Sequence, residues 1–116
     1  ECTVHRNYKA KILKAKDIDT IATGKRLGHP VRCLKNQFSR ELFKQEYNPQ
    51  VTDEQLEQMG AGALRKAAKE GDEKNGSFMA GQCAAMVHQE QTAQEMIEEM
   101  FAKAEQLLKK SPSYCS

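Results

Sequence analysis

The sequence has few aromatic residues, no long apolar run and no amino-terminal signal. Seven of its 116 residues are aromatic, so its core would be built mostly from aliphatic and methionine side chains. No stretch approaches the roughly 18 uninterrupted apolar residues that span a membrane, and residues 1–5 lack the apolar run of a signal peptide. Because the chain starts at Glu1 and lacks a signal peptide, we expect part of a longer protein. Without a membrane span it should be soluble with no membrane partner, and its widely spaced cysteines, interpreted as reduced thiols, fit the cytoplasm.

Motifs of a metal site or of self-sufficient catalysis are absent. His5, His29 and His88 lie far apart and there is no Cys-x-x-Cys pair, so we predict no metal site. There is no G-x-S-x-G elbow, Walker loop or G-x-G-x-x-G turn, and the glycine pair at 60–62 lies inside a helical pattern. The even number of cysteines permits two disulfides, but their wide spacing favours reduced thiols. They are Cys2, Cys33, Cys83 and Cys115.

Positive charge is concentrated in the first part of the chain. Residues 1–47 contain eleven Lys or Arg against five acidic residues, whereas residues 48–116 contain seven against eleven. A surplus of this size attracts phosphates or an acidic protein. A lysine-rich helix face that is merely solvated accounts for the same numbers, and we predict no nucleic-acid partner.

The spacing of apolar residues predicts short elements. A helix is expected over residues 7–16, with Asn7 as its cap, and a small ribbon or irregular chain over residues 17–33. Capping boxes at Thr52 and Thr92 start later helices, and Gly71 is a suitable C-cap. The later helices are expected over residues 34–47, 53–70 and 92–110.

Ser77 opens the most apolar segment, residues 78–87, which we also expect to be helical. Four small residues leave little bulk on it, so another backbone or a flat ligand can approach closely. Packing of this helix on a sheet in a larger protein accounts for the same pattern. The small residues are Ala80, Gly81, Ala84 and Ala85.

Several unusual strings follow one another along the chain. They are Glu1-Cys2-Thr3-Val4-His5-Arg6-Asn7-Tyr8-Lys9 with Lys14-Ala15-Lys16-Asp17-Ile18-Asp19-Thr20, Gly28-His29-Pro30-Val31-Arg32, and Gln58-Met59-Gly60-Ala61-Gly62 leading to Gly76-Ser77-Phe78-Met79-Ala80-Gly81-Gln82. In order and spacing they resemble the carboxyl-terminal part of the flavin-dependent trans-2-enoyl-acyl-carrier-protein reductases. The resemblance covers nearly the whole chain.

This resemblance implies an α/β fold, a TIM-type flavin barrel, of which the chain is the mostly helical carboxyl-terminal part with a small β insertion. Residues 1–16 would be the loop and helix after the last strand, residues 17–51 the insertion, and residues 52–116 the helices that close the barrel. The missing amino-terminal part of the barrel would be a partner, and the whole protein a homodimer.

The implied reaction uses FMN and takes hydride from NADH or NADPH to reduce the trans-2 double bond of an enoyl thioester in fatty-acid elongation. Acyl carrier protein, which holds the thioester, would be the second partner. The family's catalytic histidine lies upstream, so no residue of this chain is catalytic and the chain alone would be inactive.

The resemblance also implies which residues meet the ligands. Glycine would admit the flat ring, the amide of Gln82 would bond polar atoms of flavin or substrate, and Met79 would form a pocket wall. The flavin contacts would be Met79, Ala80, Gly81 and Gln82, and the substrate contacts His5, Asn7 and Met79. Five cations could face the acidic carrier or the phosphates of the nicotinamide cofactor: Lys9, Lys11, Lys14, Arg26 and Arg32.

Two other interpretations remain open at this point. Nitronate monooxygenases share the barrel, the flavin and the small-residue string, but their flavin is reoxidised by oxygen. The strings Asn7-Tyr8-Lys9 and Asp17-Ile18-Asp19-Thr20 favour the reductase. Alternatively, the amphipathic face of residues 92–110 could make the chain a non-catalytic helical interaction module.

Overall fold

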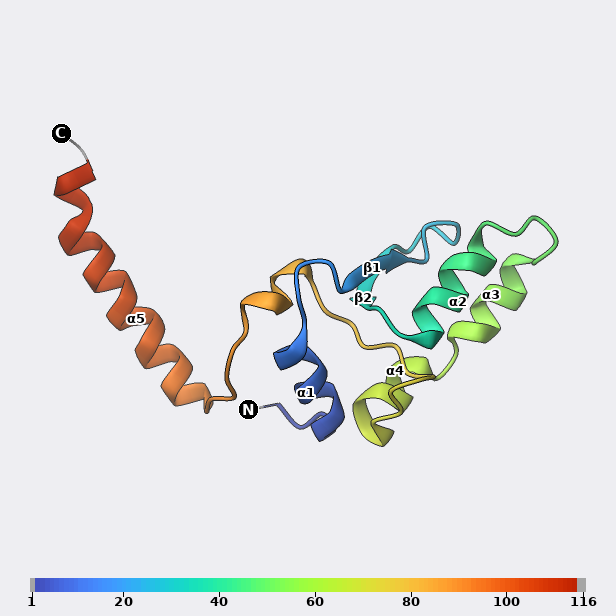
Figure 1. The fold of residues 1–116 in the computed structure, drawn as a ribbon, viewed down its shortest axis with the longest axis horizontal. Coiled ribbons are helices and arrows are strands. Elements are labelled where there is room, and N and C mark those ends of the chain that lie inside the picture. Colours follow the sequence, from blue (N-terminus) through green and yellow to red (C-terminus); the bar gives the residue numbers. More distant parts are fainter. Residues whose placement is uncertain (1, 115–116) are drawn as a thin grey trace. The chain divides into compact units, whose positions relative to one another are not determined.

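The computed structural model describes residues 2–114, and these form two compact units (Figure 1). Residues 3–88 make up the larger unit, and residues 89–114 with Cys2 the smaller one. The smaller unit contains α5 (Ala93–Lys110) and the 3-10 turn η3 (Ser111–Tyr114). The α-helices of the larger unit are α1 (Arg6–Lys14), α2 (Gln37–Glu46), α3 (Asp53–Gly60) and α4 (Ala63–Arg65). Its other elements are the strands β1 (Thr20–Thr23) and β2 (Val31–Leu34), the π-helical turn η1 (Lys66–Glu70) and the 3-10 turn η2 (Gln82–Met86).

His5 caps α1, so the prediction that Asn7 does so is wrong. The ring nitrogen Nδ1 of His5 accepts a hydrogen bond from the backbone N–H of Asn7 at 3.1 Å. Asn7 therefore lies in the first turn, and its side-chain amide is directed away from the helix to the carbonyl oxygen of Gly71 at 2.8 Å. A histidine can replace the usual Ser, Thr, Asp or Asn here because its neutral ring supplies the same acceptor.

The predicted ribbon is confirmed. Strands β1 and β2 pair antiparallel, with Thr20 opposite Leu34 and Thr23 opposite Val31. The turn between them needs glycine at position 24, because φ is +82° there and a Cβ would lie 2.5 Å from the carbonyl oxygen of His29.

Residues 78–80 extend this sheet and do not form the predicted helix. The N–H of Leu34 donates to the carbonyl of Phe78 at 2.8 Å, the N–H of Ala80 donates to the carbonyl of Arg32 at 3.1 Å, and Met79 bridges Cys33. Helical structure begins only at η2, and as a 3-10 turn. The run of small apolar residues fits either conformation, and pairing with β2 decides between them.

Asn36 sets the start of α2 and ties it to a distant loop. Its side-chain oxygen accepts from the N–H of Ser39 at 2.8 Å, and Ser39 returns the bond, which completes a capping box. Its side-chain nitrogen donates to the carbonyls of Glu73 and Gly76 at 3.1 and 2.7 Å. The helix consequently begins at Gln37 and not at residue 34, where its start was predicted.

The helix predicted over residues 53–70 is broken in the middle. The capping box of Thr52 and Gln55 is present, and Gly71 ends the helical stretch in the left-handed region, as expected. However, α3 ends at Gly60, and Gly62 has φ of +75° before α4 begins. Two glycines within three residues are poor helix formers, and they allow the chain to turn there.

The core of the larger unit joins segments that are far apart in the sequence. It consists of Tyr8, Leu34, Ala67 and Phe78, with Val4, Ile12, Ala15, Ala68 and Ala80 packed around it. The rings of Tyr8 and Phe78 lie 5.0 Å apart in a tilted arrangement, and Phe78 is fully buried. The core therefore holds α1, β2, η1 and the 77–80 segment together.

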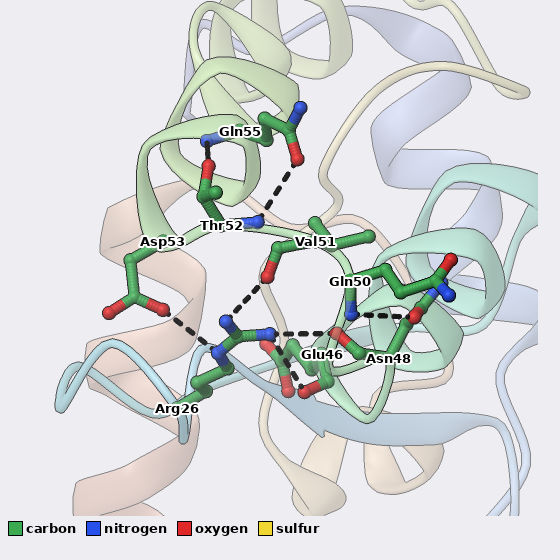
Figure 2. A network of polar contacts seen from close by, with 8 residues as sticks. All are labelled: Arg26, Glu46, Asn48, Gln50, Val51, Thr52, Asp53 and Gln55. Carbon is green, nitrogen blue, oxygen red and sulfur yellow. Dashed lines mark hydrogen bonds and ion pairs between the residues drawn. The ribbon is translucent and has the colours of Figure 1, made fainter.

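Arg26 holds the loop between α2 and α3 (Figure 2). Its guanidinium donates to the carbonyls of Asn48 and Val51 at 3.1 and 2.5 Å and forms an ion pair with Asp53 at 2.8 Å. The buried carboxylate of Glu46 accepts from the N–H of Gly24, which fixes the strand turn to the end of α2. Arg26 is thus occupied inside the chain and is not a free cation.

In the smaller unit, Thr92 and Glu95 form the predicted capping box of α5. Lys103 pairs with Glu99 at 2.6 Å, and the hydrogen bond from Lys103, helped by one from Gln91, lowers the pKa of Glu99. The helix has a strongly exposed apolar face that contains Ile97, Met100, Phe101, Leu107 and Leu108. Among the residues described, no helix is both long and apolar enough to cross a membrane.

Replacing Arg26 tests its role in this loop. We expect Arg26→Ala to lower the free energy of local opening of residues 48–52 by roughly 1–3 kcal/mol, because charge-assisted bonds to backbone carbonyls are lost. Arg26→Lys should show most of the same loss, since a lysine cannot reproduce the forked geometry. Amide hydrogen exchange measures both, and protection unchanged in Arg26→Ala would contradict the assignment.

Candidate functional site

A tight turn at residues 72–76 precedes the candidate site, which is the segment of residues 79–82. The carboxylate of Asp72 accepts hydrogen bonds from the N–H groups of Lys74 and Asn75 and from the side chain of Asn75, at 3.1–3.2 Å. These bonds, led by that from the Asn75 side chain, lower the pKa of Asp72. Gly76 is required because a Cβ would lie 2.7 Å from the carbonyl oxygen of Asp72 and 2.8 Å from the nitrogen of Ala67.

Met79 is fixed through its backbone and exposed through its side chain. Its carbonyl oxygen accepts the hydroxyl of Tyr8 at 2.6 Å, and its backbone bridges Cys33 of β2. The side chain is directed outward, since the residue is 42% exposed while its neighbour Phe78 is buried. Alternation along the extended segment therefore places Met79 on the surface at a fixed position.

Gly81 and Gln82 lie next to Met79 and are exposed. The backbone of Gly81 is extended, with φ of −77°, and a Cβ there would meet only the sulfur of Cys83, at an ordinary 3.8 Å. Nothing in the described part of the chain thus demands glycine at this position. The side-chain amide of Gln82 makes no hydrogen bond to any described residue, so its donor and acceptor are open to an external group.

His5 and Asn7 lie together beside Gly71. A Cβ on Gly71 would overlap the ring of His5, and the carbonyl of Gly71 accepts the amide of Asn7. The backbone N–H of His5 also donates to the carbonyl of Ala68 at 2.7 Å. The backbone N–H of His5 and the side-chain amide of Asn7 therefore position α1 on η1, whereas Nδ1 of His5 caps α1 itself. The structure connects Met79 to α1 through Tyr8 instead.

Tyr8 is a site residue that the sequence interpretation missed. The sequence predicted no role for it at the site, but its hydroxyl donates to the carbonyl oxygen of Met79. The available signal was the position of Tyr8 within the Asn7-Tyr8-Lys9 string that carries the resemblance.

With this geometry described, the chain can be compared with known proteins. The profile of the nitronate monooxygenase family matches residues 1–103. The chain belongs to the nitronate monooxygenase family. A probable nitronate monooxygenase of Staphylococcus saprophyticus is 29% identical over 102 residues, which cover 87% of this chain and 28% of that protein.

Solved structures give the same fold. FabK from Thermotoga maritima superposes with a TM-score of 0.87 at 39% identity, over 96% of this chain and 35% of that chain. A mutant of the same FabK superposes with a TM-score of 0.76 at 33% identity, over 96% and 32%. This family member therefore spans about a third of the length of these relatives, and its helices and two-stranded sheet match a part of their TIM-barrel fold, which confirms the predicted fold class.

His29, His88 and Cys33 are the remaining polar candidates, and of these Cys33 pairs with Met79 through its backbone. His29 is exposed between the two strands and His88 is exposed after η2. Burial raises the pKa of the Cys33 thiol, although a hydrogen bond with Thr23 and the charge of Arg32 oppose this. Within residues 2–114 no three His, Cys, Asp or Glu side chains gather as a metal site.

Of the four cysteines, three are free thiols in the structure: Cys2, Cys33 and Cys83. The predictions that concern Cys115 and Glu1 lie outside the described residues.

The Tyr8 hydroxyl is the simplest test of how the site is held. Tyr8→Phe keeps the ring on Phe78 but leaves the carbonyl of Met79 without this donor, and we expect local opening of residues 78–81 to become easier by about 1 kcal/mol. Hydrogen exchange of the full-length protein measures this. The control is Tyr47→Phe, because Tyr47 is 68% exposed and its hydroxyl bonds no described residue. Equal effects of the two variants would contradict the role of Tyr8.

Proposed function

We propose that the full-length protein containing this chain is an FMN-dependent oxidoreductase that reduces the trans-2 double bond of enoyl thioesters. FabK, an enoyl-acyl-carrier-protein reductase, supports this proposal through its 39% identity and its TM-score of 0.87. Both FabK and the nitronate monooxygenase family are flavin enzymes. The reductant would be NADH or NADPH, the substrate would be carried by acyl carrier protein, and the protein would work as a homodimer.

The observation that carries the proposal is the exposed glycine at position 81. Its φ is ordinary, and a side chain there would meet no close neighbour in the described chain. Glycine at such a position is expected where a flat group from outside the chain lies against the backbone. The residues present therefore fit the isoalloxazine ring of FMN.

Four residues would hold that ring, and each contributes something different. Ala80 and Gly81 would offer a backbone without bulk, the amide of Gln82 would donate to or accept from polar ring atoms, and Met79 would form an apolar wall. When bound, FMN supplies the hydride-transfer chemistry. The backbone bonds of residues 78–80 to β2, together with the Tyr8 hydroxyl, fix the direction from which these groups face the ring.

His5 and Asn7 would contribute to the substrate pocket only from its edge. Nδ1 of His5 and the amide of Asn7 already have partners inside the chain, so their free surface is the Nε2 side of His5 and the oxygen of Asn7. Proton transfer to the substrate would need a group supplied by the remaining two thirds of the protein. We therefore propose that the chain alone is inactive.

Nitronate oxidation is the second candidate. It is supported by the family profile over residues 1–103 and by the relative from Staphylococcus saprophyticus. The same exposed glycine and glutamine would serve it equally well, because both reactions use a flavin and we propose the same flavin position for each. The two candidates differ in what reoxidises the flavin: an enoyl thioester in one case and oxygen in the other.

A direct assay separates them. The purified full-length protein, saturated with FMN, is mixed either with crotonyl thioester and NADH under anaerobic conditions, or with an alkyl nitronate and oxygen. We expect NADH consumption that depends on the thioester, and little consumption of oxygen that depends on the nitronate. The reverse pattern would assign the protein to the nitronate reaction.

A substitution at Gly81 tests the flavin site itself. Gly81→Val should leave the melting temperature of the apoprotein nearly unchanged, because the residue is exposed and an added Cβ meets only the sulfur of Cys83, at 3.8 Å. It should weaken FMN binding by at least about tenfold, since the branched side chain separates ring from backbone. The matched control is Gly60→Ala, where the added Cβ also meets no neighbour. Unaltered FMN affinity in Gly81→Val would contradict this placement of the flavin.

A further inference from the structure

A hollow lined by residues of α1, α2 and the end of β2 differs in chemical character from the exposed glycine segment. It encloses about 270 Å³ and is bordered by four cationic side chains, one carboxylate and two apolar side chains. We call it the basic pocket; its residues are Lys11, Lys14, Ala15, Asp19, Leu34, Lys35 and Arg40.

Three elements that are distant in sequence bring these cations together. Lys11 and Lys14 come from the last turn of α1, Lys35 directly follows β2, and Arg40 belongs to α2. The backbone between them is fixed by a hydrogen bond from the N–H of Lys35 to the carbonyl of Asp19 at 2.7 Å. The cations therefore converge because of the fold and not because of one charged helix face.

The charges of the basic pocket are not balanced within the chain. Four cations face one acid, Asp19, and an oxygen of that acid already accepts the backbone N–H of Lys16 at 2.9 Å. None of the four cations forms an ion pair with any described residue, although Lys11 lies 5.2 Å from the ring of Phe78. Lys14, Lys35 and Arg40 are exposed, so water and salt screen much of their mutual repulsion, and a bound anion would remove the rest.

The helix dipole explains only half of this arrangement. Lys11 and Lys14 are favourable at the carboxyl end of α1 without any ligand. Lys35 and Arg40 receive no such benefit, since Lys35 lies outside a helix and Arg40 is in the first half of α2. Their presence beside the two lysines is the feature that points to a ligand.

We propose that the basic pocket binds the phosphate or diphosphate group of a small molecule. Its volume suits a group of that size with a few attached carbons, and Ala15 and Leu34 provide an apolar wall for those carbons. The forked guanidinium of Arg40 suits two phosphate oxygens, and the ammonium groups act as point charges around them. An acidic protein surface fits less well, because protein surfaces dock on broad patches and not in small recesses.

Nucleotides, pantetheine phosphates and free phosphate all present this chemistry. The site does not depend on which reaction the protein catalyses, so it can fail while the proposed function holds, and the reverse.

The test measures binding of inorganic pyrophosphate to the full-length protein by calorimetry at low ionic strength. The variant is Lys14→Gln with Lys35→Gln, which removes two exposed charges of the pocket. The control is Lys25→Gln with Lys69→Gln, which removes the same charge at exposed positions outside it. We expect the pocket variant to lose about tenfold or more in affinity and the control to lose less than about twofold.

Three further arms identify the source of the phosphate. NADH, NADPH and pantetheine 4′-phosphate are each titrated against both double variants, and the natural ligand is the one whose affinity falls only in the pocket variant. Free phosphate is assigned if pyrophosphate alone shows that pattern. The proposal is overturned if both double variants lose affinity equally or if neither does. Melting temperatures of both variants within a few degrees of the parent exclude misfolding as the cause.

Discussion

The burial of Phe78 is the constraint on which the arrangement of this chain depends. With its ring enclosed by Tyr8, Leu34 and Ala67, the residues on either side must run extended along β2, and backbone hydrogen bonds to Leu34 and Arg32 fix their register. Alternation then exposes Met79, and the chain leaves the core at Gly81. Tyr8 and Lys11 of α1 both contact the ring of Phe78. Phe78 thus packs against two residues of the basic pocket, Lys11 and Leu34, and directly precedes the 79–82 segment.

We propose distinct tasks for these two regions. At the 79–82 segment a flat group can lie against uncharged, exposed backbone, whereas the basic pocket concentrates positive charge. Neither contains a group that could carry out catalysis alone, which agrees with a chain that spans about a third of its relatives. The exposed apolar face of α5 is of the kind that another part of a longer protein or a binding partner covers, and the interaction module stays an alternative prediction.

Local signals in the sequence predicted much of the fold. The capping boxes at Thr52 and Thr92, the C-cap at Gly71 and the ribbon of residues 20–34 depend on neighbouring residues, so they could be read directly. Three features could not be predicted in this way. Residues 78–80 are extended because they pair with a strand some forty residues away, and His5 replaces Asn7 as a cap because the side chain of Asn7 reaches Gly71. The basic pocket forms because the fold brings cations from three elements together. Non-local contacts decided each of these. The positions of His5, Asn7 and Met79 toward a substrate stay predictions.

The placement of the flavin at Gly81 is tested most directly by hydrogen exchange of residues 79–83 in the full-length protein, measured with and without FMN. If the flavin lies on the exposed backbone at Gly81, these amides should become protected when FMN binds, by an amount that follows FMN occupancy. Residues 48–52 in the loop held by Arg26 should be unaffected and serve as an internal reference. Full FMN occupancy with unchanged exchange at residues 79–83 would contradict the assignment of this segment.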